Sequence, residues 1–121
     1  MARDDRTARR DPHQLLPLTP AAFHVLLSLA DGEKHGYAIL KEVSARTARD
    51  VELSTGTLYG IIKRLLADGL IRESAAGSTH RRRAYRLTDF GRRVALAEAE
   101  RLQDLVRTAQ LKKLLVRTSS V

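Results

Sequence analysis

Apolar residues recur at helical spacing in three consecutive segments of this chain, and this repeat limits the fold more than any other feature of the sequence. The first segment starts at Thr19-Pro20, because threonine caps a helix and proline fits its first turn, and it stops at Asp31-Gly32. Its predicted inward face consists of Phe23, Leu26, Leu27 and Ala30. We therefore expect the folded part of the chain to begin near Leu15.

The second and third segments repeat this pattern. The second runs from about His35 to Thr47, and its predicted inward stripe consists of Leu40, Val43 and Ser44. The third has Ser54 as its cap and stops at Asp68-Gly69. Its apolar positions are Leu58, Ile61, Ile62, Leu65 and Leu66. The sequence thus predicts three helices with short connections.

Two strand-like runs follow the third helix. Residues 70–73 and 83–87 are separated by turn-forming residues, including the stretch AAGSTH, and together they predict a β-hairpin. Thr88 then caps a last helix that we expect to continue to about Leu115. Three helices and a hairpin in this order predict a mainly α fold with a small β-hairpin, the winged helix-turn-helix, over residues 15–87. Residues 88–121 would form a C-terminal helix and tail.

The charge of the chain indicates a polyanionic partner. Lys and Arg number 22 against 14 Asp and Glu, a net charge of +8 on 121 residues, which favours nucleic acid. An anionic membrane surface is the alternative, but it requires a basic amphipathic helix with exposed large apolar residues, and only the C-terminal helix resembles one. No stretch approaches the ~18 consecutive apolar residues of a membrane span, so we expect a cytoplasmic protein without a membrane partner.

The third helix carries the first set of candidate DNA-binding residues. A recognition helix places the N-terminal part of its outward face in the major groove. Here the outward positions are Thr55, Gly56, Thr57, Tyr59, Gly60 and Lys63, next to Ser54 at the cap. Threonine can contact base edges, glycine permits close approach, and Tyr59 and Lys63 suit phosphates. The alternative is that the threonines only cap the helix or face solvent and that Tyr59 is partly buried.

The second set lies at the tip of the predicted hairpin, which has the densest charge in the sequence. It consists of His80, Arg81, Arg82 and Arg83. Guanidinium groups at this position can enter a narrow minor groove or bind phosphates, although a run of charge is also typical of a solvated surface. Residues 1–14 mix arginine with aspartate and have no apolar repeat. We expect them to form a flexible basic arm, either merely disordered or making a second minor-groove contact.

Patterns typical of enzymes are absent from the sequence. The chain has no cysteine, and its four histidines include no pair at the i, i+4 spacing that builds a metal site on a helix. Its seven glycines do not form a phosphate-binding loop, and no nucleophile elbow or kinase signature occurs. We therefore expect a protein that is not an enzyme and needs no metal or cofactor.

Three segments of the chain together resemble the PadR family of bacterial regulators. They are LLSLADGEKHGYAILKEV, LSTGTLYGIIKRLLADGLI and RRRAYRLTDFGRR, in this order and with short gaps. The resemblance implies a repressor whose recognition helix, here with Thr55, Thr57, Tyr59 and Lys63, meets an inverted-repeat operator. It also implies that Tyr37 lies close to the DNA backbone. The family usually has proline where this chain has Gly60, which puts the rigidity of that helix in question.

A single helix after the wing is similar to the short subfamily, in which that helix forms the dimer. Some short members bind flat aromatic drugs at the dimer centre with the help of tryptophan. This chain has no tryptophan, so the ligand class does not carry over. A small-molecule effector at the dimer interface remains an open option.

The residues of the last helix favour a homodimer independently. Phe90, Val94 and Ala97 can pack on the chain's own wing and first helix. A further apolar stripe has little left to cover it and consists of Ala99, Leu102, Leu105, Val106 and Ala109. A core of only ~70 residues gains from added burial, so we expect this stripe to pair with a second copy. The alternative is a helix that folds back wholly onto its own domain.

The sequence thus predicts a homodimeric, sequence-specific regulator that binds double-stranded DNA. The rival hypothesis is a winged-helix module that binds DNA without sequence preference, or binds another protein, and responds to no effector.

Overall fold

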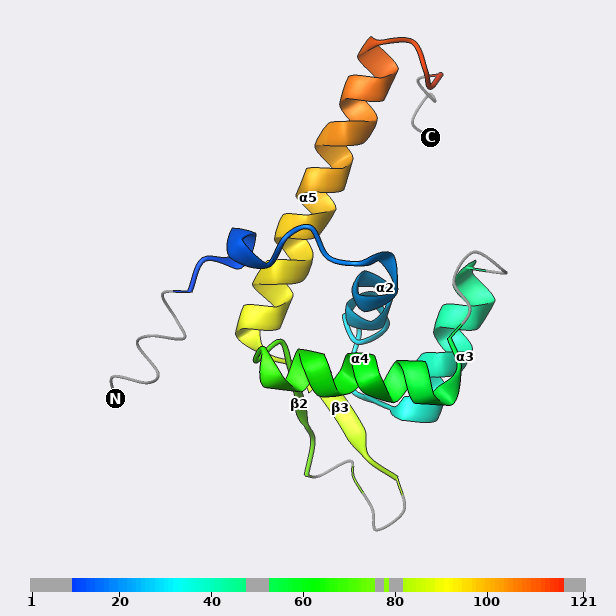
Figure 1. Ribbon diagram of the computed structural model, residues 1–121, viewed down its shortest axis with the longest axis vertical. Coiled ribbons are helices and arrows are strands. Elements are labelled where there is room, and N and C mark those ends of the chain that lie inside the picture. Colours follow the sequence, from blue (N-terminus) through cyan, green and yellow to red (C-terminus); the bar gives the residue numbers. More distant parts are fainter. Residues whose placement is uncertain (1–9, 48–52, 76–77, 79–81, 117–121) are drawn as a thin grey trace.

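The computed structural model describes residues 10–47, 53–75, 78 and 82–116 (Figure 1). The helical elements are η1 (Pro12–Leu15), α2 (Pro20–Ser28), α3 (Gly36–Thr47), α4 (Thr55–Ala67) and α5 (Asp89–Leu111). The strands are β1 (Lys34–His35), β2 (Ile71–Glu73) and β3 (Ala84–Leu87). The predicted mainly α winged helix-turn-helix is confirmed. In the described residues, no helix has both the length and the apolar character needed to span a membrane.

Three of the helices begin at the residues predicted as caps. The side chains of Thr19, Ser54 and Thr88 each accept a hydrogen bond from the backbone N–H three residues later. Such a bond satisfies one of the N–H groups that a helix leaves free in its first turn. The last helix ends at Leu111, four residues before the predicted end near Leu115. Local capping chemistry therefore sets the start of each of these helices.

The sheet has one strand more than the predicted hairpin. The strand order is β1-β3-β2, with both pairs antiparallel. Lys34 pairs with Tyr85 and His35 with Ala84, so the residues just before α3 are joined to the base of the wing. Because β1 has only two residues, both polar, it has no apolar alternation that could predict a strand.

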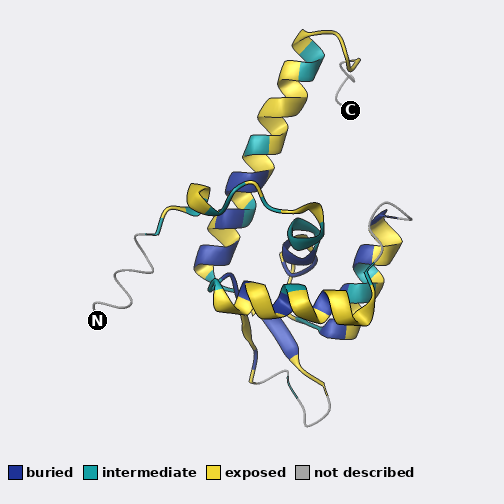
Figure 2. Cartoon of the chain, viewed as in Figure 1, coloured by how far each residue is buried: buried dark blue, intermediate teal, exposed yellow. Residues whose placement is uncertain are grey.

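The core of the molecule lies where α2, α3, α4, the sheet and the first half of α5 meet (Figure 2). The predicted inward face of α2 is wrong except at Leu26. Val25, Leu26 and Leu29 are buried, whereas Leu27 and Ala30 are exposed and Phe23 is only half-buried. This helix has apolar residues on most of its circumference, so the packing of the neighbouring helices, and not its own pattern, decides which side faces inward.

Two more inward positions are corrected in α3 and α4. Ser44 is exposed, and Ile39 together with Val43 supplies the buried stripe of α3. Leu66 is 37% exposed, because α4 buries the neighbouring row of Leu58, Ile62 and Leu65. The buried stripe of α3 is therefore shifted from the predicted one toward Ile39, whereas the predicted stripe of α4 is too wide at Leu66.

The fold begins before Leu15, contrary to the prediction of an arm that ends at residue 14. Asp11 caps η1, and this short helix packs against α5. The Arg10 guanidinium lies 4.2 Å from the centre of the Phe90 ring and donates a hydrogen bond to the Asp68 carbonyl oxygen at 2.8 Å. Arg10 is therefore held against the domain and does not belong to a flexible basic arm.

Helix α5 packs on the domain with its first half and extends beyond it with its second (Figure 1). Phe90, Val94 and Ala97 are buried as predicted. Gly91 lies so close to the turn between α4 and β2 that a Cβ there would come within 1.8 Å of the Leu70 carbonyl oxygen. The alternative of a last helix folded wholly onto its own domain is thus wrong.

A buried carboxylate attaches the segment before α2 to α5. Glu98 is 2% exposed, forms two hydrogen bonds with the Arg101 guanidinium at 2.7 and 2.9 Å, and accepts a third from Leu18 N–H at 3.3 Å. The hydrogen bond from Arg101 holds the pKa of Glu98 below its usual value, with burial acting in the opposite direction.

Candidate nucleic-acid interface

The outward face of α4 consists largely of small residues. Gly56, Gly60, Lys63 and Ala67 are all exposed and follow one another at helical spacing on the side opposite the core. A Cβ built at Gly56 or Gly60 has no atom within 4 Å. A helix face without bulk can approach another surface closely, and Lys63 gives this face a positive charge.

Hydroxyl groups lie at the N-terminal end of this face. The Ser54 Oγ accepts a hydrogen bond from Thr57 N–H at 3.1 Å and donates one to the Thr57 Oγ1 at 2.9 Å. Ser54 is therefore the helix cap, while Thr55 and Thr57 are exposed. These positions agree with the predicted recognition face and also show that Ser54 has a local structural role.

Two tyrosines extend the surface from α4 to the start of α3. The Tyr59 ring lies over Gly36, where a Cβ would come within 2.7 Å of the Tyr59 Oη. The neighbouring Tyr37 is 60% exposed, and the Lys41 Nζ lies 5.6 Å from its ring centre. Gly36 thus permits the Tyr59 ring of α4 to pack on the first turn of α3, where Tyr37 also lies.

At the tip of the wing, the structure describes only part of the predicted basic cluster. Arg82 and Arg83 are exposed, whereas His80 and Arg81 lie outside the described residues. The Arg83 Nη1 lies 2.6 Å from the Glu73 Oε2 across the hairpin, and this hydrogen bond raises the pKa of Arg83 further. Arg83 is therefore partly neutralised by a neighbour on the other strand.

The two strands of the wing carry a basic pair that was not predicted from the sequence. Arg72 and Arg86 lie directly opposite each other in the β2–β3 register, and both are exposed. Like charges at facing positions destabilise a hairpin. Within the described part of the chain, neither arginine forms an ion pair. The strand alternation of the sequence could have revealed this pair, since Ile71, Tyr85 and Leu87 mark the opposite face.

The predicted dimer stripe is uncovered on the outer half of α5. Leu102, Leu105 and Val106 are 37%, 55% and 46% exposed, Ala99 is also exposed, and Ala109 is half-buried. These large apolar side chains are thus exposed to solvent. They belong to the part of α5 that extends from the domain and is mostly coloured as exposed in Figure 2. Such rows are typical of interaction surfaces.

The described residues contain no group of three or more His, Asp or Glu side chains that could hold a metal ion. Titratable groups with shifted pKa values are dispersed. Burial lowers the pKa of His24 and raises that of Tyr85, and these two side chains belong to α2 and β3. The exposed features on α4, the wing and the outer half of α5 are therefore the main candidates for function.

Comparison with known proteins identifies the family of the chain. The model of the transcriptional regulator PadR-like family matches residues 25–97. The transcriptional regulator Rv3488 of Mycobacterium tuberculosis is 38% identical over 85 residues, which cover 69% of this chain and 77% of that protein.

Solved structures share the fold. A PadR family transcription regulator from Clostridium difficile has a TM-score of 0.62 at 24% identity, over 80% of this chain and 100% of its own. Bacillus subtilis PadR in complex with operator DNA has a TM-score of 0.55 at 20% identity, over 87% of this chain and 50% of its own. The family match over more than half of the chain and the likeness to Rv3488 show that the chain belongs to the PadR-like family of transcriptional regulators.

Proposed function

We propose that this protein is a homodimeric repressor that binds an inverted-repeat DNA operator through α4 and the wing. The observation that carries the proposal is the outward face of α4, where small residues stand between hydrogen-bonding side chains and a lysine. A helix of this kind fits the major groove, because its backbone can approach the base edges. The fold that the chain shares with a PadR protein solved in complex with operator DNA supports the proposal of DNA binding.

The side chains on the surface formed by α4, the start of α3 and the wing would have two different roles. Thr55 and Thr57, at the N-terminal end of α4, are placed to read base edges. Tyr37, Tyr59 and Lys63 are placed to contact phosphates and set the register of the helix. The arginines of the wing, Arg81–Arg83 and the pair Arg72 and Arg86, would add phosphate or minor-groove contacts. Base contacts should therefore decide sequence preference, and the remaining contacts should decide affinity.

The dimer would form through the outer half of α5. The exposed stripe of Leu102, Leu105 and Val106 supplies an apolar seam, and a two-fold axis would bring the same residues of both copies together. Half-sites of such dimers lie about 34 Å apart, one turn of DNA. With both half-sites bound by one dimer, the second contact is effectively intramolecular and raises the affinity.

Competition binding tests this proposal. The probe is the DNA immediately upstream of the gene that encodes the chain, and the competitor is the same fragment with shuffled sequence. Specific binding should exceed non-specific binding by ~10³ or more at physiological salt. Equal affinity for both fragments would contradict the proposal and favour the rival hypothesis of a winged helix that binds DNA without sequence preference.

Alanine variants of the two threonines test the reading role. Thr55→Ala and Thr57→Ala should each lower the discrimination between the two fragments, by up to ~1–3 kcal/mol for a contact that reads a base. Thr108→Ala is the matched control, because Thr108 is exposed and belongs to the outer half of α5. That half of the helix extends away from α4 (Figure 1). An equal loss of affinity on both fragments would make the threonines positioning residues.

A further inference from the structure

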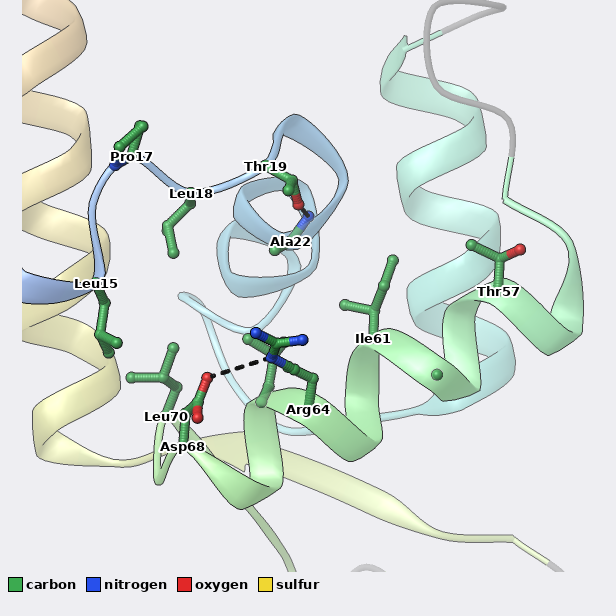
Figure 3. A pocket seen from close by; sticks show the side chains of 12 residues that line it. Leu15, Pro17, Leu18, Thr19, Ala22, Thr57, Ile61, Arg64, Asp68 and Leu70 are labelled. Carbon is green, nitrogen blue, oxygen red and sulfur yellow. Dashed lines mark hydrogen bonds and ion pairs between the residues drawn. The ribbon is translucent and has the colours of Figure 1, made fainter.

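An open pocket of about 480 Å³ lies between the segment before α2, the first turn of α2 and one side of α4 (Figure 3). Its wall is mainly aliphatic and includes Leu15, Pro17, Leu18, Ala22, Ile61 and Leu65. Among the described residues that line it, none is aromatic. Small-molecule sites usually have volumes of ~300–1,000 Å³ and mostly apolar walls, so this pocket has the size and surface of a ligand site.

The polar rim of the pocket carries one guanidinium group, that of Arg64, and one carboxylate, that of Asp68. The Arg64 side chain is 83% exposed, and its Nε lies 4.0 Å from the Asp68 Oδ2, at the outer limit of an ion pair (Figure 3). Because the Arg64 guanidinium is largely exposed and only weakly paired, it can donate hydrogen bonds to an anionic group of a ligand.

Gly60 keeps the α4 side of the pocket open. This residue lines the pocket, and a Cβ built there has no atom within 4 Å. Glycine in a helix interior costs roughly 0.5–1 kcal/mol relative to alanine, and packing does not require it at this position. A residue that opposes the local helix preference without a packing reason is typical of a functional surface.

We propose that this pocket binds an aliphatic carboxylate, with the hydrocarbon chain against the apolar wall and the carboxylate at Arg64, and that its binding weakens the binding of DNA. The second half of the inference rests on the proposed function. Thr57 and Gly60 belong both to the pocket rim and to the outward face of α4. A bound carboxylate would therefore add negative charge beside the surface that meets phosphates.

The pocket is also connected to α5. Leu18 forms part of the pocket wall, and its N–H donates to the Glu98 carboxylate, which pairs with Arg101. The exposed stripe of α5 begins at the adjacent Ala99. A ligand that displaces the Leu18 backbone would disturb this hydrogen bond. The pocket is thus lined by the helix proposed to bind DNA and is linked through Leu18 to the helix proposed to form the dimer.

Titration with sodium octanoate tests the site directly. In ¹H–¹⁵N NMR spectra of the full chain, we expect saturable shifts in the amides of the pocket, foremost Leu18, Gly60, Ile61 and Arg64. Ala22→Met places a longer side chain in the pocket and should abolish the saturable shifts. Ala38→Met is the matched control, because Ala38 is an exposed helical residue that does not line the pocket. Circular dichroism of both variants checks that they are folded.

The role of Arg64 is tested with a neutral ligand. Octanamide has the same chain without the charge, so it should bind more weakly than octanoate, and Arg64→Gln should remove this difference. Shifts confined to the α5 stripe, or shifts that Ala22→Met leaves unchanged, would overturn the site. Equal binding of octanoate and octanamide would overturn the assignment of an anionic ligand.

A DNA titration separates the two proposals. With octanoate saturating, the affinity for the upstream fragment should fall about five-fold or more, a coupling within the usual range between two sites. Octanoate binding in the pocket with unchanged DNA affinity would overturn the coupling and leave the ligand site. If the chain binds DNA but shows no octanoate shifts, this inference is overturned and the proposed function stands. If octanoate shifts occur in a chain that binds no DNA, the ligand site stands and the proposed function is overturned.

Discussion

Gly91→Ala should strongly destabilise the protein, because Gly91 faces a backbone carbonyl at the junction of α5 and the wing. A Cβ at this position would lie 1.8 Å from the Leu70 oxygen and 2.7 Å from the Leu70 carbonyl carbon. An ordinary C···O contact is about 3.3 Å or longer, so the helix or the turn must move by about 1.5 Å. Both atoms are main chain, and no side-chain rotation can relieve the contact.

The movement would break a hydrogen bond as well as the packing. Leu70 is 1% exposed, and its carbonyl oxygen accepts from Thr88 N–H at 3.1 Å. A buried carbonyl left without a donor costs about 1–3 kcal/mol, and overpacking typically costs another 1–3 kcal/mol. Alanine recovers roughly 0.5–1 kcal/mol through its helix preference. We therefore expect a net loss of about 2–4 kcal/mol in the free energy of unfolding.

Urea unfolding at a fixed protomer concentration measures this loss, since the stability of a dimer depends on concentration. Gly60→Ala is the matched control: it is the same substitution in a helix interior with no atom within 4 Å, and it should gain about 0.5–1 kcal/mol. If Gly91→Ala is as stable as the parent while Gly60→Ala is more stable than the parent, the close packing of α5 on Leu70 is refuted.

Three further changes test the outer half of α5, the buried carboxylate and the wing. Leu102→Glu should give a monomer in sedimentation, because two carboxylates would meet in an apolar seam, and a variant that remains dimeric would refute the seam. Glu98→Gln should lower the free energy of unfolding at pH 7. Because the folded-state pKa of Glu98 lies below its usual 4.5, the difference in stability between variant and parent should disappear as the pH falls through that lower value. A difference that stays constant in unfolding measured across this pH range would contradict this account. The double variant Arg72→Gln, Arg86→Gln should have a free energy of unfolding within ~0.5 kcal/mol of the parent. Its plot of log DNA affinity against log salt concentration should be shallower by ~0.9 for each phosphate that it no longer binds. An unchanged slope would exclude these arginines from the interface.

Much of the fold could be predicted because its signals are local. Thr19, Ser54 and Thr88 cap the helices that follow them, and the two strands flank turn-forming residues. The inward face of α2 could not be chosen in this way, since Val25 and Leu29 compete with Phe23 and Leu27 for the core. Which row of an apolar helix is buried depends on helices that are distant in the sequence.

The contacts that the sequence did not reveal join charged residues over long distances along the chain. Arg10 lies on Phe90, and Glu98 accepts from Leu18 N–H. Arginine in an aspartate-containing tail and glutamate in a long helix both suggest solvent exposure. The candidate DNA-binding residues on α4 were found because amphipathic spacing identifies an outward face. Strand alternation could have identified Arg72 and Arg86 in the same way, and the strand register adds that the two arginines face each other.

The central position of β3 has a consequence for folding during synthesis. Both of its partners, β1 and β2, precede it in the chain, and β1 does so by about 50 residues. A ribosome therefore completes the sequences of α2, α3 and α4 before any strand of the sheet can find its neighbour. Helices form from local contacts, whereas strand pairing across a long loop waits for both ends. The wing base should thus assemble late, immediately before α5 emerges to cover Leu70, so the last third of the chain completes a domain whose helices are already present.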